Sequence, residues 1–141
     1  MHIQFRPGRA GISAAFFGLC FMLCLAAAGC GGSNSKCFIE GISVSPGSAT
    51  VDHAALPPGN TQQFAAFATS VPKGCVVAQS NLTNVIWSVS DPVNVSIGST
   101  PGPSFGIATC KAATAGAVTV TGTLNQADFA PVSAAASLTC N

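Results

Sequence analysis

The chain has 141 residues, and only 6% of them are charged, against about 25% in an average soluble protein. Both arginines, Arg6 and Arg9, lie near the N-terminus, and the sequence after Cys30 has three lysines and four acidic residues, a net charge of −1. Nucleic-acid binding needs clustered Lys and Arg to meet the phosphate backbone, so this charge distribution argues against a nucleic-acid partner.

The first 29 residues have the layout of a secretory signal peptide. Residues 1–11 are basic, and residues 12–28, ISAAFFGLCFMLCLAAA, carry no charge and end in small residues. The alternative is a permanent transmembrane helix, but the apolar run is close to the lower limit of about 17 residues for a spanning helix. We therefore predict a cleaved signal helix over residues 1–29.

The sequence LAAAGC at 25–30 predicts where this leader is cut. It resembles a lipoprotein signal, which has small residues before the cut and an obligatory cysteine after it, because the thiol takes up diacylglycerol as a thioether. Gly29 and Ala28 fit this pattern before Cys30, whereas Ala27 stands where the family prefers leucine. The resemblance implies lipidation of Cys30. The alternative is an ordinary signal peptide with Cys30 merely next to the cut.

The residues after Cys30 predict how the protein is held in the envelope. GGSNS at 31–35 has the composition of a flexible linker, so we expect a tether over residues 30–37. Several acyl chains, each stabilised by about 0.8 kcal/mol per buried methylene, give a lasting membrane anchor. In Gram-negative lipoproteins an Asp after the lipidated cysteine favours the inner membrane, and here that residue is Gly31. The resemblance thus implies a lipid-anchored cell-envelope protein of the outer membrane or cell surface.

The cysteines beyond Cys30 predict two disulfides. There are four, at least 30 residues apart: Cys37, Cys75, Cys110 and Cys140. An even number in an exported domain favours a disulfide framework. A zinc site would need close pairs such as C-x₂-C, and a thiol nucleophile would need a free cysteine with a histidine partner. We therefore predict no metal site and no catalytic cysteine.

Short alternating runs separated by turn residues fill the sequence from residue 38 onward. The runs lie at 42–46, 62–70, 84–90, 93–97, 106–112, 117–123 and 133–140. Alternation of apolar and polar residues, with punctuation such as SPGS, PPGN and PGP, is typical of half-buried antiparallel strands. Seven such runs with no sustained helical period predict an all-β domain, a β-sandwich, over residues 38–141.

The alternation also predicts the core. The tryptophan of the run at 84–90 supplies the largest buried area, with apolar neighbours from the facing sheet. The predicted core residues are Trp87, Phe64, Ile107, Val118 and Val120. Phe67 points away from Phe64 in a regular strand, so it either seals a sheet edge, which we favour, or forms an exposed binding patch.

The order of the runs resembles the bacterial immunoglobulin-like domain, group 2. The similar segments are ISVSP, GNTQQFAA, VIWSVSDP, GIATCKA and AGAVTVTGT, over about residues 39–123, and the most specific are TQQF at 61–64 and WSVSDP at 87–92. Two insertions, DHAALPP and KGCVVAQSNL, and the cysteines depart from the family pattern. The resemblance implies an immunoglobulin-like β-sandwich of about seven strands.

In such a sandwich Cys37 and Cys75 fall at one end, and Cys110 and Cys140 lie nearer the other. Of the three possible connectivities we prefer Cys37–Cys75 with Cys110–Cys140. The other two connectivities stay open at this point.

The sequence offers no catalytic set and implies no cofactor. The acidic residues after Cys30 lie in separate segments: Glu40, Asp52, Asp91 and Asp128. Glycoside hydrolysis would need paired carboxylates, and no G-x-S-x-G nucleophile motif is present. We interpret Asp91, which precedes a proline, as a turn residue, and His53, beside Asp52, as a solvated loop residue.

Two functions are compatible with these observations. The first is a non-enzymatic, lipid-anchored immunoglobulin-like module that acts in adhesion, binds a glycan or surface protein, or serves as a structural display domain. The alternative is a small secreted hydrolase or enzyme accessory domain on the same sandwich. The alternative requires a deep pocket that contains His53 with Asp52 or Asp128.

Overall fold

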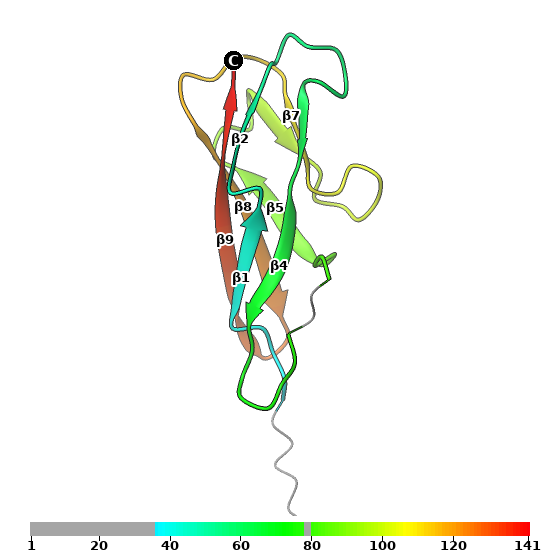
Figure 1. Cartoon of the computed structure of the whole chain (residues 1–141), viewed down its shortest axis with the longest axis vertical. Helices are drawn as coiled ribbons and strands as arrows, with labels where there is room; N and C mark the ends of the chain where they lie inside the picture. Colours follow the sequence, from blue (N-terminus) through cyan, green and yellow to red (C-terminus); the bar gives the residue numbers. More distant parts are fainter. Residues whose placement is uncertain (1–35, 78–79) are drawn as a thin grey trace, which may run out of the picture. The chain divides into compact units, whose positions relative to one another are not determined.

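Nine strands build the part of the chain that the computed structural model describes, residues 36–77 and 80–141 (Figure 1). In chain order they are β1 (Gly41–Ser45), β2 (Ser48–Val51), β3 (Thr61–Gln63), β4 (Ala65–Ser70), β5 (Val85–Val89), β6 (Val95–Ile97), β7 (Ile107–Cys110), β8 (Val118–Gln126) and β9 (Phe129–Cys140). The described residues are all-β, and they include no helix that could cross a membrane. The predicted signal peptide and Cys30 lie outside these residues.

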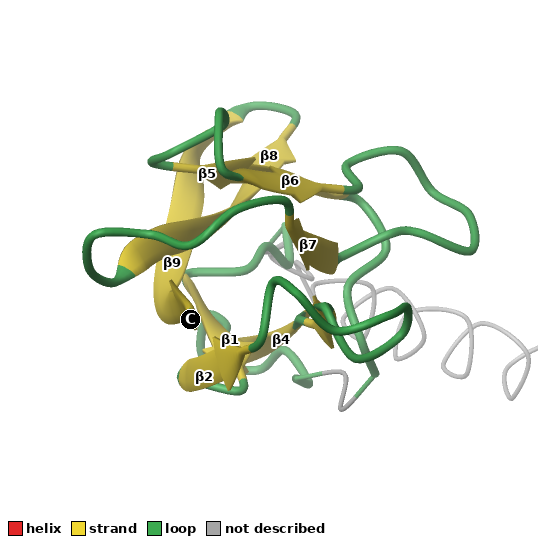
Figure 2. Ribbon diagram, turned by 90° about the horizontal axis from the view of Figure 1, so that it is seen from above, coloured by secondary structure: helices red, strands yellow, loops and turns green. Residues whose placement is uncertain are grey.

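The strands form three small sheets. β1 pairs with β4, the second sheet has the order β2-β9-β8-β5, and the third has the order β3-β7-β6. All pairs are antiparallel except β2 with β9, which run parallel. Seen from above, β1, β2 and β4 lie on one side of the domain, and β5, β6 and β8 lie on the other (Figure 2).

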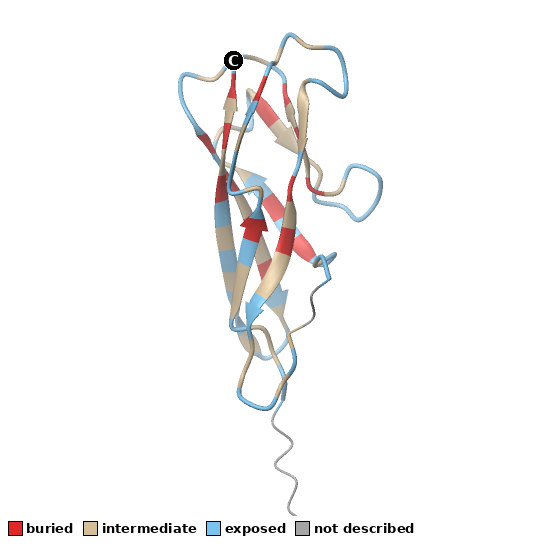
Figure 3. Ribbon diagram, in the orientation of Figure 1, coloured by how far each residue is buried: buried red, intermediate tan, exposed pale blue. Residues whose placement is uncertain are grey.

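Residues from all three sheets form one apolar core, and Figure 3 shows the buried positions in red along the strands. Four of the five predicted core residues are among them: Phe64 is 1% exposed, Trp87 4%, Val118 4% and Val120 0%. The described residues include no buried charged or polar residue in this core. The stability of the fold therefore comes mainly from removing apolar surface from water.

The fifth predicted core residue, Ile107, is only half-buried, and this expectation was wrong. The buried residues of β7 are Ala108, at 0% exposure, and Cys110, at 1%. Successive side chains of a strand point to opposite faces, and the disulfide between Cys110 and the buried Cys140 holds Cys110 inside. Ile107 must therefore lie on the other face of β7.

The structure has two strands more than the seven runs predicted. The first is β2, which the chain reaches directly after β1 through Pro46 and Gly47. Proline has no N–H to continue the β1 ladder, and the chain moves from its pairing with β4 to a parallel pairing with β9. The second arises because the run at 62–70 is divided at Phe64: β3 before it pairs with β7, and β4 after it pairs with β1.

Trp87 is accommodated by two glycines on neighbouring segments. Gly122 lies opposite Trp87 in the β5–β8 pair, and a Cβ there would approach the indole Cζ3 to 3.1 Å. Gly106 has φ +72° and lies so close to Phe64 that a Cβ would stand 2.4 Å from the Phe64 carbonyl oxygen. Only glycine combines this backbone conformation with such a close approach.

Candidate functional site

Two disulfides mark the two ends of the domain. Cys37 pairs with Cys75 at a Cα–Cα distance of 5.7 Å, and Cys110 pairs with Cys140 at 5.8 Å. These are the pairs that we preferred from the sequence. The described chain begins at Lys36 beside the first disulfide, which we call the entry end, and finishes beside the second, which we call the far end (Figure 1). Because disulfides persist in oxidising compartments, the two pairs indicate an extracytoplasmic protein.

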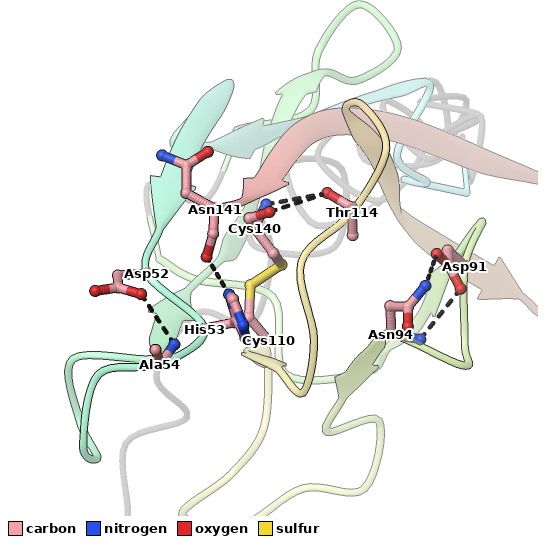
Figure 4. The surroundings of a disulfide bond; sticks show 9 residues. All are labelled: Asp52, His53, Ala54, Asp91, Asn94, Cys110, Thr114, Cys140 and Asn141. Atoms are coloured by element: carbon pink, nitrogen blue, oxygen red, sulfur yellow. Dashed lines mark hydrogen bonds between the residues drawn. A yellow bond between two sulfur atoms is a disulfide. The ribbon is translucent and has the colours of Figure 1, made fainter.

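The far-end disulfide is buried, and hydrogen bonds from the backbone and from the Thr114 side chain connect the segments around it (Figure 4). The Cys140 N–H donates to Thr114 Oγ1 at 3.1 Å, and the Thr114 N–H donates to the Cys140 carbonyl at 2.9 Å. The Asn141 N–H donates to Val51 O at 2.9 Å. The loop between β7 and β8 and the last residues of the chain are thus joined to the end of β2.

His53 belongs to this far-end network rather than to a pocket. Its backbone N–H donates to the Asn141 carbonyl at 3.1 Å, and its ring Nδ1 lies against the same oxygen (Figure 4). The neighbouring Asp52 accepts the Ala54 N–H at Oδ1, at 2.9 Å, as in a local turn. Asp128, the other carboxylate considered for a catalytic set, bonds Lys36 at the entry end. The structure therefore does not bring His53 and Asp128 together.

Asp91 has the role of a turn residue that the sequence predicted. Its Oδ2 accepts Asn94 Nδ2 at 2.8 Å, and its Oδ1 accepts the Asn94 N–H at 3.1 Å (Figure 4). The hydrogen bond from the Asn94 side chain, followed by that from its backbone, lowers the pKa of Asp91 below its ordinary value. This carboxylate therefore stabilises the turn between β5 and β6 in its ionised form.

A pocket of about 300 Å³ lies at the entry end, next to the exposed disulfide. Its lining residues are Cys37, Phe38, Ile39, Ala68, Val71, Val76 and Gln126. Val76 is 90% exposed at the rim. No local sequence pattern predicts this pocket, because its walls come from three segments that are far apart in the chain.

The one amide side chain in the pocket bonds the backbone of Ile39 through both its oxygen and its nitrogen. Gln126 Oε1 accepts the Ile39 N–H at 2.7 Å, and Gln126 Nε2 donates to the Ile39 carbonyl at 2.8 Å. The glutamine side chain thus takes the place of a neighbouring strand for Ile39. The other six lining residues have apolar or sulfur side chains, so the pocket is mainly apolar in character.

Two further contacts hold the entry segment against the β8–β9 hairpin. The rings of Phe38 and Phe129 stack with centroids 4.1 Å apart. Lys36 Nζ and Asp128 Oδ2 form an exposed ion pair at 3.1 Å, which contributes little because solvent screens it. Stacking, the Gln126 hydrogen bonds and the disulfide together fix the first described residues to the domain.

The remaining candidate, Phe67, lies in β4 opposite Ser43 of β1 and is half-buried. Within residues 36–77 and 80–141, no group of three or more His, Cys, Asp or Glu side chains is placed to hold a metal ion. Two buried side-chain atoms in the same residues lack a hydrogen-bond partner, Asn60 Oδ1 and Trp87 Nε1. Buried waters commonly satisfy such atoms.

The described residues thus define an all-β domain of three small sheets, stapled by a disulfide at each end. Comparison of the chain with protein-family models finds no match, and comparison with curated proteins finds none either. The resemblance to group 2 immunoglobulin-like domains therefore stays a prediction.

Proposed function

We propose that this chain is a lipid-anchored module of the cell envelope, held through acyl chains on Cys30 and built on an immunoglobulin-like β-sandwich. It acts in adhesion, in binding a glycan or surface protein, or in structural display, and it has no catalytic activity. The observation that carries the proposal is the pair of disulfides, because disulfides persist mainly in oxidising compartments outside the cytoplasm. The leader ending in LAAAGC supplies the route of export and the anchor.

The strand order supports the immunoglobulin-like part of the proposal. With β3 and β4 taken as one strand interrupted at Phe64, one sheet has the order β1, β3/β4, β7, β6 and the other has the order β2, β9, β8, β5. Immunoglobulin domains place strands A, B, E and D in one sheet and C, F and G in the other, with a buried tryptophan on strand C. In this scheme β5 corresponds to strand C, and it carries the buried Trp87.

The positions of the two ends support display. The predicted tether, residues 30–37, leads into the domain at the entry end, while the loop after β2 and the loop after β7 lie at the far end (Figure 1). The loop after β2 carries Leu56, whose side chain is 86% exposed. Binding residues in β-sandwich proteins commonly lie on loops that a rigid scaffold presents. The far-end loops are therefore the surface that we assign to partner binding.

The anchor is tested by labelling the producing cells with an alkyne-tagged fatty acid. The wild-type chain and a Cys24→Ala variant, which changes another cysteine of the leader, should both be labelled and should sediment with membranes. A Cys30→Ala variant should lose the label. Equal labelling of the Cys30→Ala variant, or no labelling of the wild type, would contradict lipidation at this residue.

Partner binding is tested with the membrane-extracted protein on arrays of glycans and envelope proteins. A ligand of the far-end loops should bind a Leu56→Ser variant more weakly and a Val76→Ser variant, changed at the entry end, as well as the wild type. Loss of binding in the Val76→Ser variant alone would contradict the assignment of the far-end loops.

A further inference from the structure

The apolar pocket at the entry end has the properties of a surface that contacts lipid. We propose that this end of the domain rests on the bilayer, with Val76 and the pocket rim at the boundary between headgroups and acyl chains. The inference rests on the proposed lipid anchor. It adds to the anchor a second, direct contact between the folded domain and the membrane, which fixes the orientation of the domain.

The chemistry of the rim favours lipid. Val76 is 90% exposed, a higher exposed fraction than that of Leu56, Ile86 or Val93. Phe38, Ile39 and Val71 line the pocket beside it. A glutamine lies with these side chains, and its amide oxygen and nitrogen each bond the Ile39 backbone, so the pocket is mainly apolar. An exposed apolar cluster of this kind marks an interaction site.

The size of the pocket suits an aliphatic chain. Its volume is about 300 Å³. A water molecule takes up about 30 Å³ in the liquid, and a methylene group is of similar size, so the pocket has room for a lipid tail segment on the order of ten methylene groups. A rigid wall favours such binding, and the disulfide and the stacked rings of Phe38 and Phe129 provide it.

The length of chain before the domain limits how far the pocket can lie from the membrane. Cys37 lies seven positions after Cys30, and a fully extended chain spans at most about 3.6 Å per residue. With acyl chains on Cys30, the Cys37–Cys75 disulfide therefore stays within about 25 Å of the bilayer surface. Cys37 itself lines the pocket, so the pocket lies within the same reach, and the short tether keeps its local concentration at the membrane high.

The charges at this end do not oppose the contact. Lys36 is paired with Asp128, and Lys73, in the same loop as Val76, is exposed. Glu40, also exposed, balances Lys73. With a charge balance near zero, the contact depends on apolar burial rather than on attraction to anionic lipid, and it should persist in high salt.

The experiment uses the acylated protein purified from membranes and placed in vesicles of phosphatidylethanolamine and phosphatidylglycerol that contain brominated acyl chains. Bromine quenches tryptophan fluorescence at close range. A Val76→Trp variant reports the entry end, and a Leu56→Trp variant is the matched control, since Leu56 is also a highly exposed residue and lies in the loop after β2 at the far end. The wild type, with only the buried Trp87, supplies the background.

The inference predicts that bromolipid quenches Val76→Trp at least about twofold more than Leu56→Trp, because interfacial contacts bury side chains about 5–10 Å into the headgroup region. Flotation of the same samples distinguishes failure of the lipid anchor from failure of the direct contact between the domain and lipid. A protein that floats with the vesicles while both variants are quenched equally weakly overturns the lipid contact and leaves the anchor intact; a second copy or another protein would then cover the pocket. A protein that does not float overturns the anchor and this inference with it.

Discussion

The two disulfides should contribute differently to stability, although the loops that they close are alike. Their sequence separations are 38 and 30 residues. From loop-closure entropy alone, removing either cross-link should lower the free energy of unfolding by about 4 kcal/mol. Cys110 and Cys140 are each 1% exposed, whereas Cys37 is exposed. Removing the two buried sulfur atoms costs about 1 kcal/mol more for each.

We therefore expect the free energy of unfolding to fall by about 5–6 kcal/mol in the double variant C110A/C140A and by about 4 kcal/mol in C37A/C75A. Domains of this size have free energies of unfolding of about 5–15 kcal/mol, so C110A/C140A should be only marginally folded or unfolded at 25 °C. Urea unfolding followed by the fluorescence of Trp87 gives the free energy from the midpoint and slope. The reasoning is refuted if C37A/C75A is the less stable variant, or if either variant loses less than about 1 kcal/mol.

Three further outcomes are expected. Gly122→Ala should destabilise the domain by about 1–3 kcal/mol in the same urea assay, because the added methyl group meets Trp87 at 3.1 Å; no loss would mean that the indole shifts freely. Gln126→Ala should cost about 1–2 kcal/mol and speed hydrogen exchange at the Ile39 amide, which loses its acceptor; unchanged exchange would contradict this role. Asp91→Asn should lower the melting temperature at neutral pH, and the difference from wild type should shrink as the pH falls below about 4. The reason is that the native pKa of Asp91 is lowered, so its ionised form stabilises the fold above the unfolded pKa, and this stabilisation disappears as the native carboxylate is protonated. A difference in melting temperature that is constant with pH would contradict this role of Asp91.

The strands could be predicted where a local pattern determined them. The alternation around Trp87 places the tryptophan and Val85 inside, and the structure buries both. β2 was missed because its partner β9 lies almost 90 residues further along the chain, and a parallel pairing at that separation leaves no local signal. Ile107 was assigned to the wrong face because the strand alternates Ile, Ala, Thr, Cys, and hydrophobicity alone favours the larger side chain.

At the two ends of the domain, too, some features could be predicted from the sequence and others could not. The cysteine pairing followed from the order of strands that the resemblance implied, because alternating strand directions bring Cys37 near Cys75 and Cys110 near Cys140. The pocket and the Gln126–Ile39 hydrogen bonds could not be predicted. A glutamine at the end of a strand has no pattern that tells which backbone, 87 residues away, it will bond.

The intact mass of the protein extracted from membranes tests the central claim most directly. The account predicts the mass of residues 30–141 with acyl groups added and four hydrogens missing, as two disulfides require. A mass that still includes residues 1–29, that lacks the acyl groups, or that retains all four thiol hydrogens would contradict a lipid-anchored, disulfide-stapled domain.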